Sequence, residues 1–332
     1  MKLALDFPAL LQAFFTDRLM TQRNASPHTI AAYRDTFRLL FKYAWEQLDR
    51  APSALTLEDL NSTFIGAFLD HLERDRGNNA RSRNARLAAI HSFFRYVAYQ
   101  LPEHSSLIQR VLAIPGKKHE RALVDYLTEE ETNALLDAPD RSTITGRRDY
   151  VLMLVGIQTG LRVSELTGLS CGHVTFGTGA HVRCVGKGRK ARCTPLTQSV
   201  AAVVKAWIKE RYAQPDDPLF PNRRGRQLST DGVQFILAKH VTVAQQQCPS
   251  LKEKKVSPHV LRHTAAMNLL HAGGDVATIA LWLGHERLET VNIYVEADLS
   301  AKEEILARTA TPEGKAKRFR PDDALLAFLK SL

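Results

Sequence analysis

The sequence predicts a mainly helical protein of two domains, an all-α N-terminal domain and a C-terminal domain that adds a small antiparallel β-sheet (α+β). A length of 332 residues suggests two domains rather than one. The first 101 residues repeat apolar side chains at helical spacing. By contrast, residues 181–185 and 192–197 alternate like two strands on either side of a glycine-containing turn. The apolar fraction of 44% is that of a globular protein with well-formed cores.

Four amphipathic helices are expected in the N-terminal domain, residues 1–101. Their ranges are 6–22, 26–48, a segment that starts after residue 56, and 79–99. Ser26 and Pro27 form a favourable start for the second helix, and Glu58 and Asp59 stand in the first turn of the third. Each helix therefore has one apolar face with which it can pack into a bundle.

Basic residues follow the outer faces of these helices. Arg34, Arg38 and Lys42 recur at four-residue spacing along the second helix, beside its apolar face. Arg81 and Arg95 point away from the apolar stripe of the fourth helix. Cationic outer faces suit contact with DNA phosphates, although an ordinary solvated face explains any single arginine equally well.

Both domains are basic. The net charge is +10, with 13 Lys and Arg against 10 Asp and Glu in residues 1–101 and 32 against 25 in the rest. This balance favours a polyanion held between the two domains. A linker is expected at residues 102–125 from its proline, glycine and serine content, interrupted by a short helix at 107–113. Its basic Lys117 and Lys118 could cross a DNA backbone and close a C-shaped clamp.

The cysteines and the apolar runs bear on the cellular compartment. Cys171, Cys184, Cys193 and Cys248 form no CxxC pair, so we expect reduced thiols in a cytoplasmic protein. Cys184 and Cys193 could face each other across the hairpin, but we expect them to serve as small buried side chains. The sequence has no signal-peptide pattern and no run of about 18 apolar residues that would span a membrane.

The C-terminal domain, residues 126–310, is expected to open with a helix at 128–138 that starts in a capping box of Thr128 and Glu131. A long apolar helix at 149–160 follows and ends at a glycine. Arg162 comes next, in the turn before a helix that starts at residue 163. An arginine held between two packed helices is preorganised to bind an anion. Glu165 is a candidate to orient Arg162, and a plain surface glutamate is the alternative.

Residues 257–296 carry the clearest chemistry, on three short helices separated near residues 273–275 and 284–288. His259 and Arg262 share a face of the first helix, His285 follows the glycine that ends the second, and Tyr294 lies on the third. A phenol that attacks a phosphodiester must lose a proton from a group of pKa about 10. Guanidinium groups stabilise the charge on the phosphate, and the departing 5′ oxygen needs a proton donor. Taken singly, each residue could instead be a helix cap or a core aromatic.

These motifs together resemble the tyrosine recombinases, the family of phage integrases and Xer-type recombinases. The resemblance rests on PHVLRH at 258–263, LGH at 283–285, and a tyrosine nine residues further on. Upstream, TGLRVSEL at 159–166 matches the arginine box and VGKGRKARCTPL at 185–196 matches the lysine hairpin. The similarity extends over about residues 4–300, which is nearly the whole chain. It implies a helical core-binding domain followed by a catalytic domain.

The resemblance also implies the roles of the candidate residues. Tyr294 would form a 3′-phosphotyrosyl bond, Arg162 and Arg262 would stabilise the phosphorane, and His259 would handle the proton of the tyrosine. His285 would bind the phosphate. The general acid of the hairpin corresponds to Lys187, with Lys190 as the alternative, and Arg189 and Lys190 are also candidate DNA contacts.

The resemblance implies double-stranded DNA with inverted-repeat core sites as the partner, bound by a homotetramer with one dimer on each of two sites. Strands would be exchanged through a Holliday junction, and accessory proteins are further candidate partners. No cofactor is implied, and the sequence has no Walker-type loop or obvious metal-ligand cluster. Integration or transposition of a mobile element is the favoured role. The alternatives are a type IB topoisomerase-like nicking-closing enzyme and a non-catalytic DNA-binding factor of this fold.

A C-terminal tail is expected at residues 311–332. Its last part has the pattern of an amphipathic helix, with apolar residues at 325, 326, 328, 329 and 332. Such a helix could dock on a neighbouring subunit or fold back on its own domain, and the sequence leaves both open.

Overall fold

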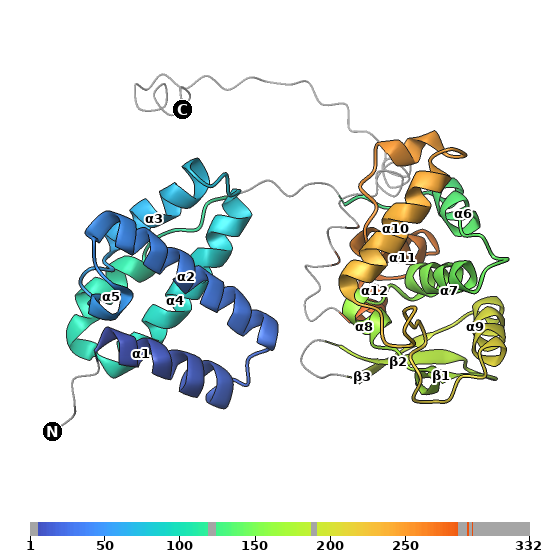
Figure 1. Cartoon of the computed structure of the whole chain (residues 1–332), viewed down its shortest axis with the longest axis horizontal. Coiled ribbons are helices and arrows are strands. Elements are labelled where there is room, and N and C mark those ends of the chain that lie inside the picture. Colours follow the sequence, from blue (N-terminus) through green and yellow to red (C-terminus); the bar gives the residue numbers. More distant parts are fainter. Residues whose placement is uncertain (1–5, 119–123, 187–190, 285–290, 292–293, 295–332) are drawn as a thin grey trace, which may run out of the picture. The chain divides into compact units, whose positions relative to one another are not determined.

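The computed structural model describes residues 6–118, 124–186, 191–284, 291 and 294. The chain forms two compact units, Met1–Arg121 and Ala122–Leu332 (Figure 1). The first unit is helical throughout its described part, and the second combines helices with a three-stranded antiparallel sheet. The predicted fold class is therefore confirmed. The expected tail helix lies outside the described residues.

Helices of different length build the N-terminal unit. They are α1 (Phe7–Ala13), the π-helix η1 (Phe14–Gln22), α2 (Pro27–Leu48), the short η2 (Pro52–Ala54), α3 (Ser62–Arg74), α4 (Ala80–Gln100), the short η3 (Pro102–His104) and α5 (Ser105–Leu112).

Aromatic rings form the centre of this unit. Phe93 on α4 contacts Phe14 and Phe37 edge to face, with ring centroids 5.5 and 5.4 Å apart. Phe7 adds a third such contact at 5.9 Å. Edge-to-face pairs stabilise aromatic cores beyond the area that they bury. The apolar faces of α1, η1, α2 and α4 therefore meet at one point, while their opposite faces remain exposed.

Capping residues explain the helix boundaries, including one that was predicted wrongly. The Ser26 hydroxyl accepts from the backbone N–H of Thr29, so α2 begins where the sequence indicated. The third helix was expected directly after Thr56. Instead, the Asp59 carboxylate accepts from the Thr56 backbone N–H and from the Arg50 guanidinium, which folds residues 56–59 into a turn. The helix α3 starts only at Ser62, after the N-cap Asn61.

The first part of the expected linker lies on the N-terminal unit. Helix α5 buries Ile108 and Val111 against this unit, and the carbonyl of Val111 is hydrogen-bonded to His91 on α4. Further along, the backbone N–H of Lys117 donates to the Asn84 side chain at 2.9 Å. The segment is thus tied to α4 as far as residue 117.

The second unit combines helices with the small sheet, which lies along one edge of the unit (Figure 1). Its elements are α6 (Glu129–Asp137), α7 (Ile144–Thr159), α8 (Val163–Thr167), the short η4 (Cys171–His173), β1 (Val174–Thr175), β2 (His181–Val185), β3 (Ala191–Pro195), α9 (Gln198–Glu210), α10 (Thr230–Ala244), the short η6 (Pro249–Lys252), α11 (Pro258–His271) and α12 (Val276–Leu283).

The sheet has the order β1-β2-β3, and both pairs are antiparallel. The hairpin of β2 and β3 was predicted, whereas β1 and the helix α9 were not. In this register Cys193 pairs with Arg183, so Cys184 is buried and Cys193 is exposed. The expected burial is therefore confirmed for Cys184 and wrong for Cys193, and the two thiols lie on opposite faces of the hairpin.

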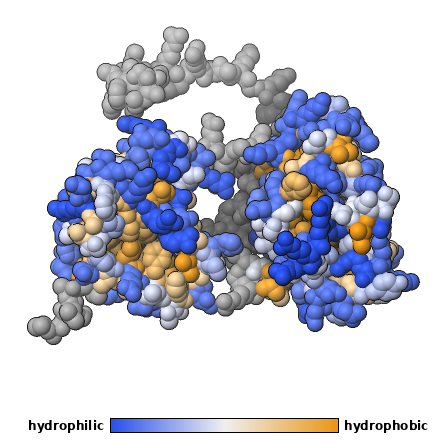
Figure 2. Space-filling view, in the orientation of Figure 1, coloured by the Kyte–Doolittle hydropathy of each residue, from blue (hydrophilic) through white to orange (hydrophobic). Residues whose placement is uncertain are grey.

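Outside the cores, the surface is mixed. Figure 2 shows hydrophilic residues over most of the visible face of each unit, with hydrophobic residues between them. Along the described residues, the helices are all too short or too polar to cross a membrane.

Candidate active site

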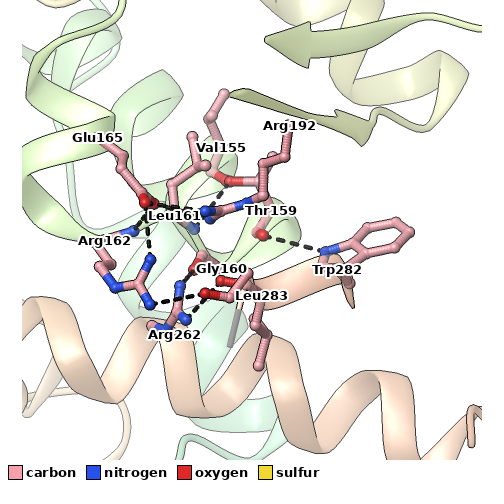
Figure 3. Close-up of polar contacts among 11 residues, drawn as sticks. Val155, Thr159, Gly160, Leu161, Arg162, Glu165, Arg192, Arg262, Trp282 and Leu283 are labelled. Carbon is pink, nitrogen blue, oxygen red and sulfur yellow. Dashed lines mark hydrogen bonds and ion pairs between the residues drawn. The ribbon is translucent and has the colours of Figure 1, made fainter. Parts of the chain in front are cut away.

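The candidate site lies where the C-terminal ends of α7 and α12 meet the start of α8 and the N-terminal half of α11 (Figure 3). Gly160 ends α7 with φ +62°, and a Cβ atom there would lie 2.6 Å from a methyl carbon of Leu283. Only glycine accepts both the left-handed backbone and this close approach. The two helix ends can therefore pack directly against each other, and Trp282 adds a hydrogen bond from Nε1 to the carbonyl of Thr159.

Arg262 connects these two helix ends from α11. Its side chain is buried, and it donates from Nη1 to the carbonyl of Gly160 at 2.6 Å and from Nη2 to that of Leu283 at 2.7 Å. Carbonyls at a helix C-terminus lack intrahelical partners and carry partial negative charge. Burial, followed by the nearby charge of Arg162, lowers the pKa of Arg262 to about 10. The guanidinium thus stays charged at neutral pH but is poorly solvated.

Arg162 approaches the same place from α8. Its Nη2 donates to the carbonyl of Gly284, the residue after Leu283, at 3.0 Å. Its Nη1 and its backbone N–H both donate to the carboxylate of Glu165. The two arginines therefore bind the successive carbonyls of Leu283 and Gly284. This proximity explains why the charge of Arg162 lowers the pKa of Arg262.

Glu165 is buried, so the surface alternative considered for it does not hold. Only 3% of its side chain is exposed, and it accepts hydrogen bonds from Arg162 and from both terminal nitrogens of Arg192. Burial alone would raise the pKa of Glu165, but the hydrogen bonds from Arg192 and the Arg162 backbone more than offset this and hold the pKa below its ordinary value. This one carboxylate binds the guanidinium groups of Arg162 and Arg192 directly and affects that of Arg262 only through its charge. This excess of positive charge suits an anion.

Tyr294 lies in the same cluster. Its side chain is 2% exposed and packs with Ala266, Met267 and Leu283 of α11 and α12. Burial raises the pKa of its phenol, and the positive charges of Arg262 and Arg162 act in the opposite direction. The phenol is therefore within electrostatic reach of both arginines.

The remaining predicted catalytic residues are only partly placed. His259 lies in the first turn of α11, one turn before Arg262, with an exposed side chain. Lys187 and His285 lie outside the described residues, as do the predicted DNA contacts Arg189 and Lys190.

The predicted DNA contacts of the N-terminal unit are exposed. They are Arg34, Arg38, Lys42, Arg81, Arg95, Lys117 and Lys118. Three have carboxylate neighbours: Arg34 with Asp35, Lys42 with Glu46, and Lys117 with Glu73. Exposed ion pairs contribute little stability, so a phosphate could replace these carboxylates at low cost.

Two residues near the site were not singled out from the sequence. His263 follows Arg262, and its ring lies against that of Tyr294 with centroids 5.6 Å apart. Its Nδ1 is hydrogen-bonded to the carbonyl of Asp125. Arg192 binds Glu165 from β3. A signal existed for Arg192, since strand alternation places it on the same face as the buried Thr194.

Comparisons with known proteins cover both units. Residues 125–300 match the model of the phage integrase family, and residues 13–100 match that of the phage integrase N-terminal SAM-like domain. The chain is 57% identical over 323 residues to y4rC of Sinorhizobium fredii, which carries the name integrase/recombinase, with 97% of each protein covered. It is 33% identical to the tyrosine recombinase XerC of Pelobacter propionicus, with 90% of this chain and 96% of that protein covered.

A solved structure has the same fold. The XerH site-specific recombinase bound to its palindromic difH substrate superposes with a TM-score of 0.70 at 24% identity. The match covers 87% of this chain and 82% of that one.

Proposed function

The chain belongs to the phage integrase family of tyrosine recombinases, and we propose that it is a site-specific recombinase that cuts and rejoins DNA through a 3′-phosphotyrosyl intermediate. One observation carries the proposal most directly. Arg162 and Arg262 donate to successive carbonyls of the turn at 283–284, and Tyr294 is buried within reach of their charge. A nucleophile beside two fixed guanidinium groups is what attack on a phosphodiester requires.

In the proposed reaction, the phenolic oxygen of Tyr294 forms a bond to phosphorus while the bond from phosphorus to the 5′ oxygen breaks. Arg162 and Arg262 stabilise the charge of the pentavalent transition state, and His285 binds a phosphate oxygen. His259 takes the proton of the phenol, and Lys187, or Lys190 in its place, gives a proton to the 5′ oxygen. The free 5′-hydroxyl of the partner strand then attacks the phosphotyrosyl bond and releases the tyrosine.

The burial of Arg262 supports this assignment energetically. Arg262 is desolvated and already fixed by two backbone carbonyls, so little reorganisation is needed when charge develops on the phosphate. Because the phosphotyrosyl bond conserves the energy of the broken phosphodiester, the reaction needs no ATP.

The substrate would be double-stranded DNA with inverted-repeat core sites, since cyclic assemblies of identical subunits bind symmetric sites. We propose a dimer on each site and a tetramer when two sites meet in a Holliday junction. The exposed cations of the N-terminal unit, such as Arg38 and Arg81, would contact the DNA backbone. The likeness to an integrase/recombinase supports integration or transposition of a mobile element as its role. For such a role the chain would act on nucleoid DNA in the cytoplasm.

Joining of two separate sites tests the proposal. The bound site is first located by footprinting on the DNA that flanks the gene. Two DNA molecules that each carry this site should then give recombinant products with the purified chain in EDTA and without ATP. Relaxation of supercoiled DNA that lacks the site, without joined products, would instead indicate a type IB topoisomerase-like enzyme. Binding without cleavage would indicate a non-catalytic DNA-binding factor.

A further inference from the structure

Arg192 forms the most complete ion pair near the candidate site. It stands on the inner face of β3 with only 13% of its side chain exposed. Its Nη1 donates to Oε1 of Glu165 at 2.9 Å, and its Nη2 donates to Oε2 at 2.8 Å. This is the paired geometry in which arginine binds a carboxylate most strongly. Both terminal nitrogens of Arg192 are thus occupied by Glu165.

Glu165 is shared between Arg192 and Arg162. Each of its oxygens receives one bond from Arg192 and one from Arg162, which donates with Nη1 and with its backbone N–H. A buried carboxylate that lost one of these partners would be left partly uncompensated, and it would shift to recover hydrogen bonds. The position of Arg162 therefore depends on Arg192 through the carboxylate that both arginines bind.

A second contact joins Arg192 to the turn that precedes His285. Gly284 ends α12 with φ +64°, and a Cβ atom there would lie 2.5 Å from Nη1 of Arg192. The guanidinium is therefore packed directly on this turn. The same turn accepts the hydrogen bond from Nη2 of Arg162 at the Gly284 carbonyl. Arg192 thus holds Arg162 from two sides, through Glu165 and through Gly284.

We propose that Arg192 is a positioning residue that fixes Arg162 for phosphate binding and couples it to the β2–β3 hairpin. The inference rests on the proposed function. Residues 187–190, with both candidate general acids, directly precede Ala191, the first residue of β3. Arg192 is the next residue, so Glu165 binds both β3, through Arg192, and Arg162. The position of the hairpin and the position of Arg162 therefore depend on each other.

Single-turnover cleavage of a nicked duplex tests the proposal. The nick lies beside the cleavage point, so the freed fragment diffuses away and the covalent complex accumulates. With saturating protein, Arg192→Gln should lower the first-order cleavage rate by about 100-fold, because a misplaced catalytic group loses about that much. The Kd for DNA should stay unchanged, because Arg192 is turned inward. Arg192→Lys should fall between Arg192→Gln and wild type, since it keeps the charge but loses the paired geometry.

Two further variants make the result specific. Arg183→Gln changes an exposed arginine of the adjacent strand β2 and should cleave like wild type. In a Glu165→Gln background, Arg192→Gln should cost little more, because residues that act through one another are not additive. The melting temperature of each variant is also measured.

The outcomes separate the inference from the proposed function. Cleavage by Arg192→Gln at the rate of Arg183→Gln overturns the inference alone. Three other results also overturn it, in favour of an independent structural role. They are losses of cleavage rate that multiply in the double variant, a parallel loss of DNA affinity, and an Arg192→Lys variant that does not fold. A wild-type chain that forms no covalent complex overturns the proposed function, and this inference with it.

Discussion

Replacing Tyr294 by phenylalanine should abolish the covalent protein–DNA complex and leave DNA binding intact. Phenylalanine keeps the ring that packs against His263 and the apolar cluster of α11 and α12, but it removes the oxygen that would bond to phosphorus. The lost hydroxyl should change the free energy of unfolding by only about 1 kcal/mol. Cleavage of a nicked duplex, followed by denaturing electrophoresis, measures the covalent complex, and a mobility-shift titration measures binding.

Tyr150→Phe is the matched control. Tyr150 lies on α7 in the same unit, half-buried, with the guanidinium of Arg141 stacked 3.8 Å from its ring centroid. This variant removes one phenolic hydroxyl without touching the candidate site, and it should cleave at the wild-type rate. A covalent complex that persists in Tyr294→Phe would mean that another residue is the nucleophile.

Arg262→Gln is expected to have the second largest effect, a loss of about 1000-fold in the single-turnover cleavage rate, as for a preorganised transition-state donor. The change also removes the guanidinium bonds to the carbonyls of Gly160 and Leu283, and leaving buried carbonyls unpaired costs about 1–3 kcal/mol of stability. Arg262→Lys should lose most of the activity too, because one ammonium group cannot reproduce the planar fork that holds both helix ends. Quenched-flow cleavage and denaturant unfolding measure the two effects separately.

Arg211→Gln controls for the structural part of that loss. Arg211 directly follows α9, and its guanidinium also donates to two backbone carbonyls, those of Pro218 and Leu219. Its contribution to the stability of the fold is therefore comparable to that of Arg262. This variant should lower the free energy of unfolding but keep its cleavage rate at temperatures where it is folded. Equal losses of cleavage in the two variants would show that Arg262 acts only through stability.

Local sequence signals predicted those elements whose boundaries are set by neighbouring residues. Ser26 and Pro27 begin α2, and Thr128 with Glu131 forms the capping box that opens α6. The third helix was misplaced because Asp59 bonds to Arg50, a residue outside the helix, and so forms a turn where the sequence suggested helix. Interactions of this kind leave no periodic pattern in the sequence.

The candidate site shows the same limit. The spacing of residues 257–296 and the resemblance of the motifs to the tyrosine recombinases together singled out Arg162, Arg262 and Tyr294. They did not show that the arginines are held by carbonyls at the ends of α7 and α12, nor that Arg192 shares Glu165 with Arg162. Those contacts join residues that are from 21 to 122 positions apart. They depend on how helices pack, which no local pattern specifies.

The central claim is that Tyr294 becomes joined to the 3′ end of the cut strand. The most direct test is to trap the complex on a nicked duplex, digest protein and DNA, and identify the cross-linked peptide by mass spectrometry. The account predicts a peptide in which Tyr294 bears a 3′-phosphonucleotide, with a free 5′-hydroxyl on the released strand. An adduct on any other residue, or a linkage to the 5′ end, would contradict it.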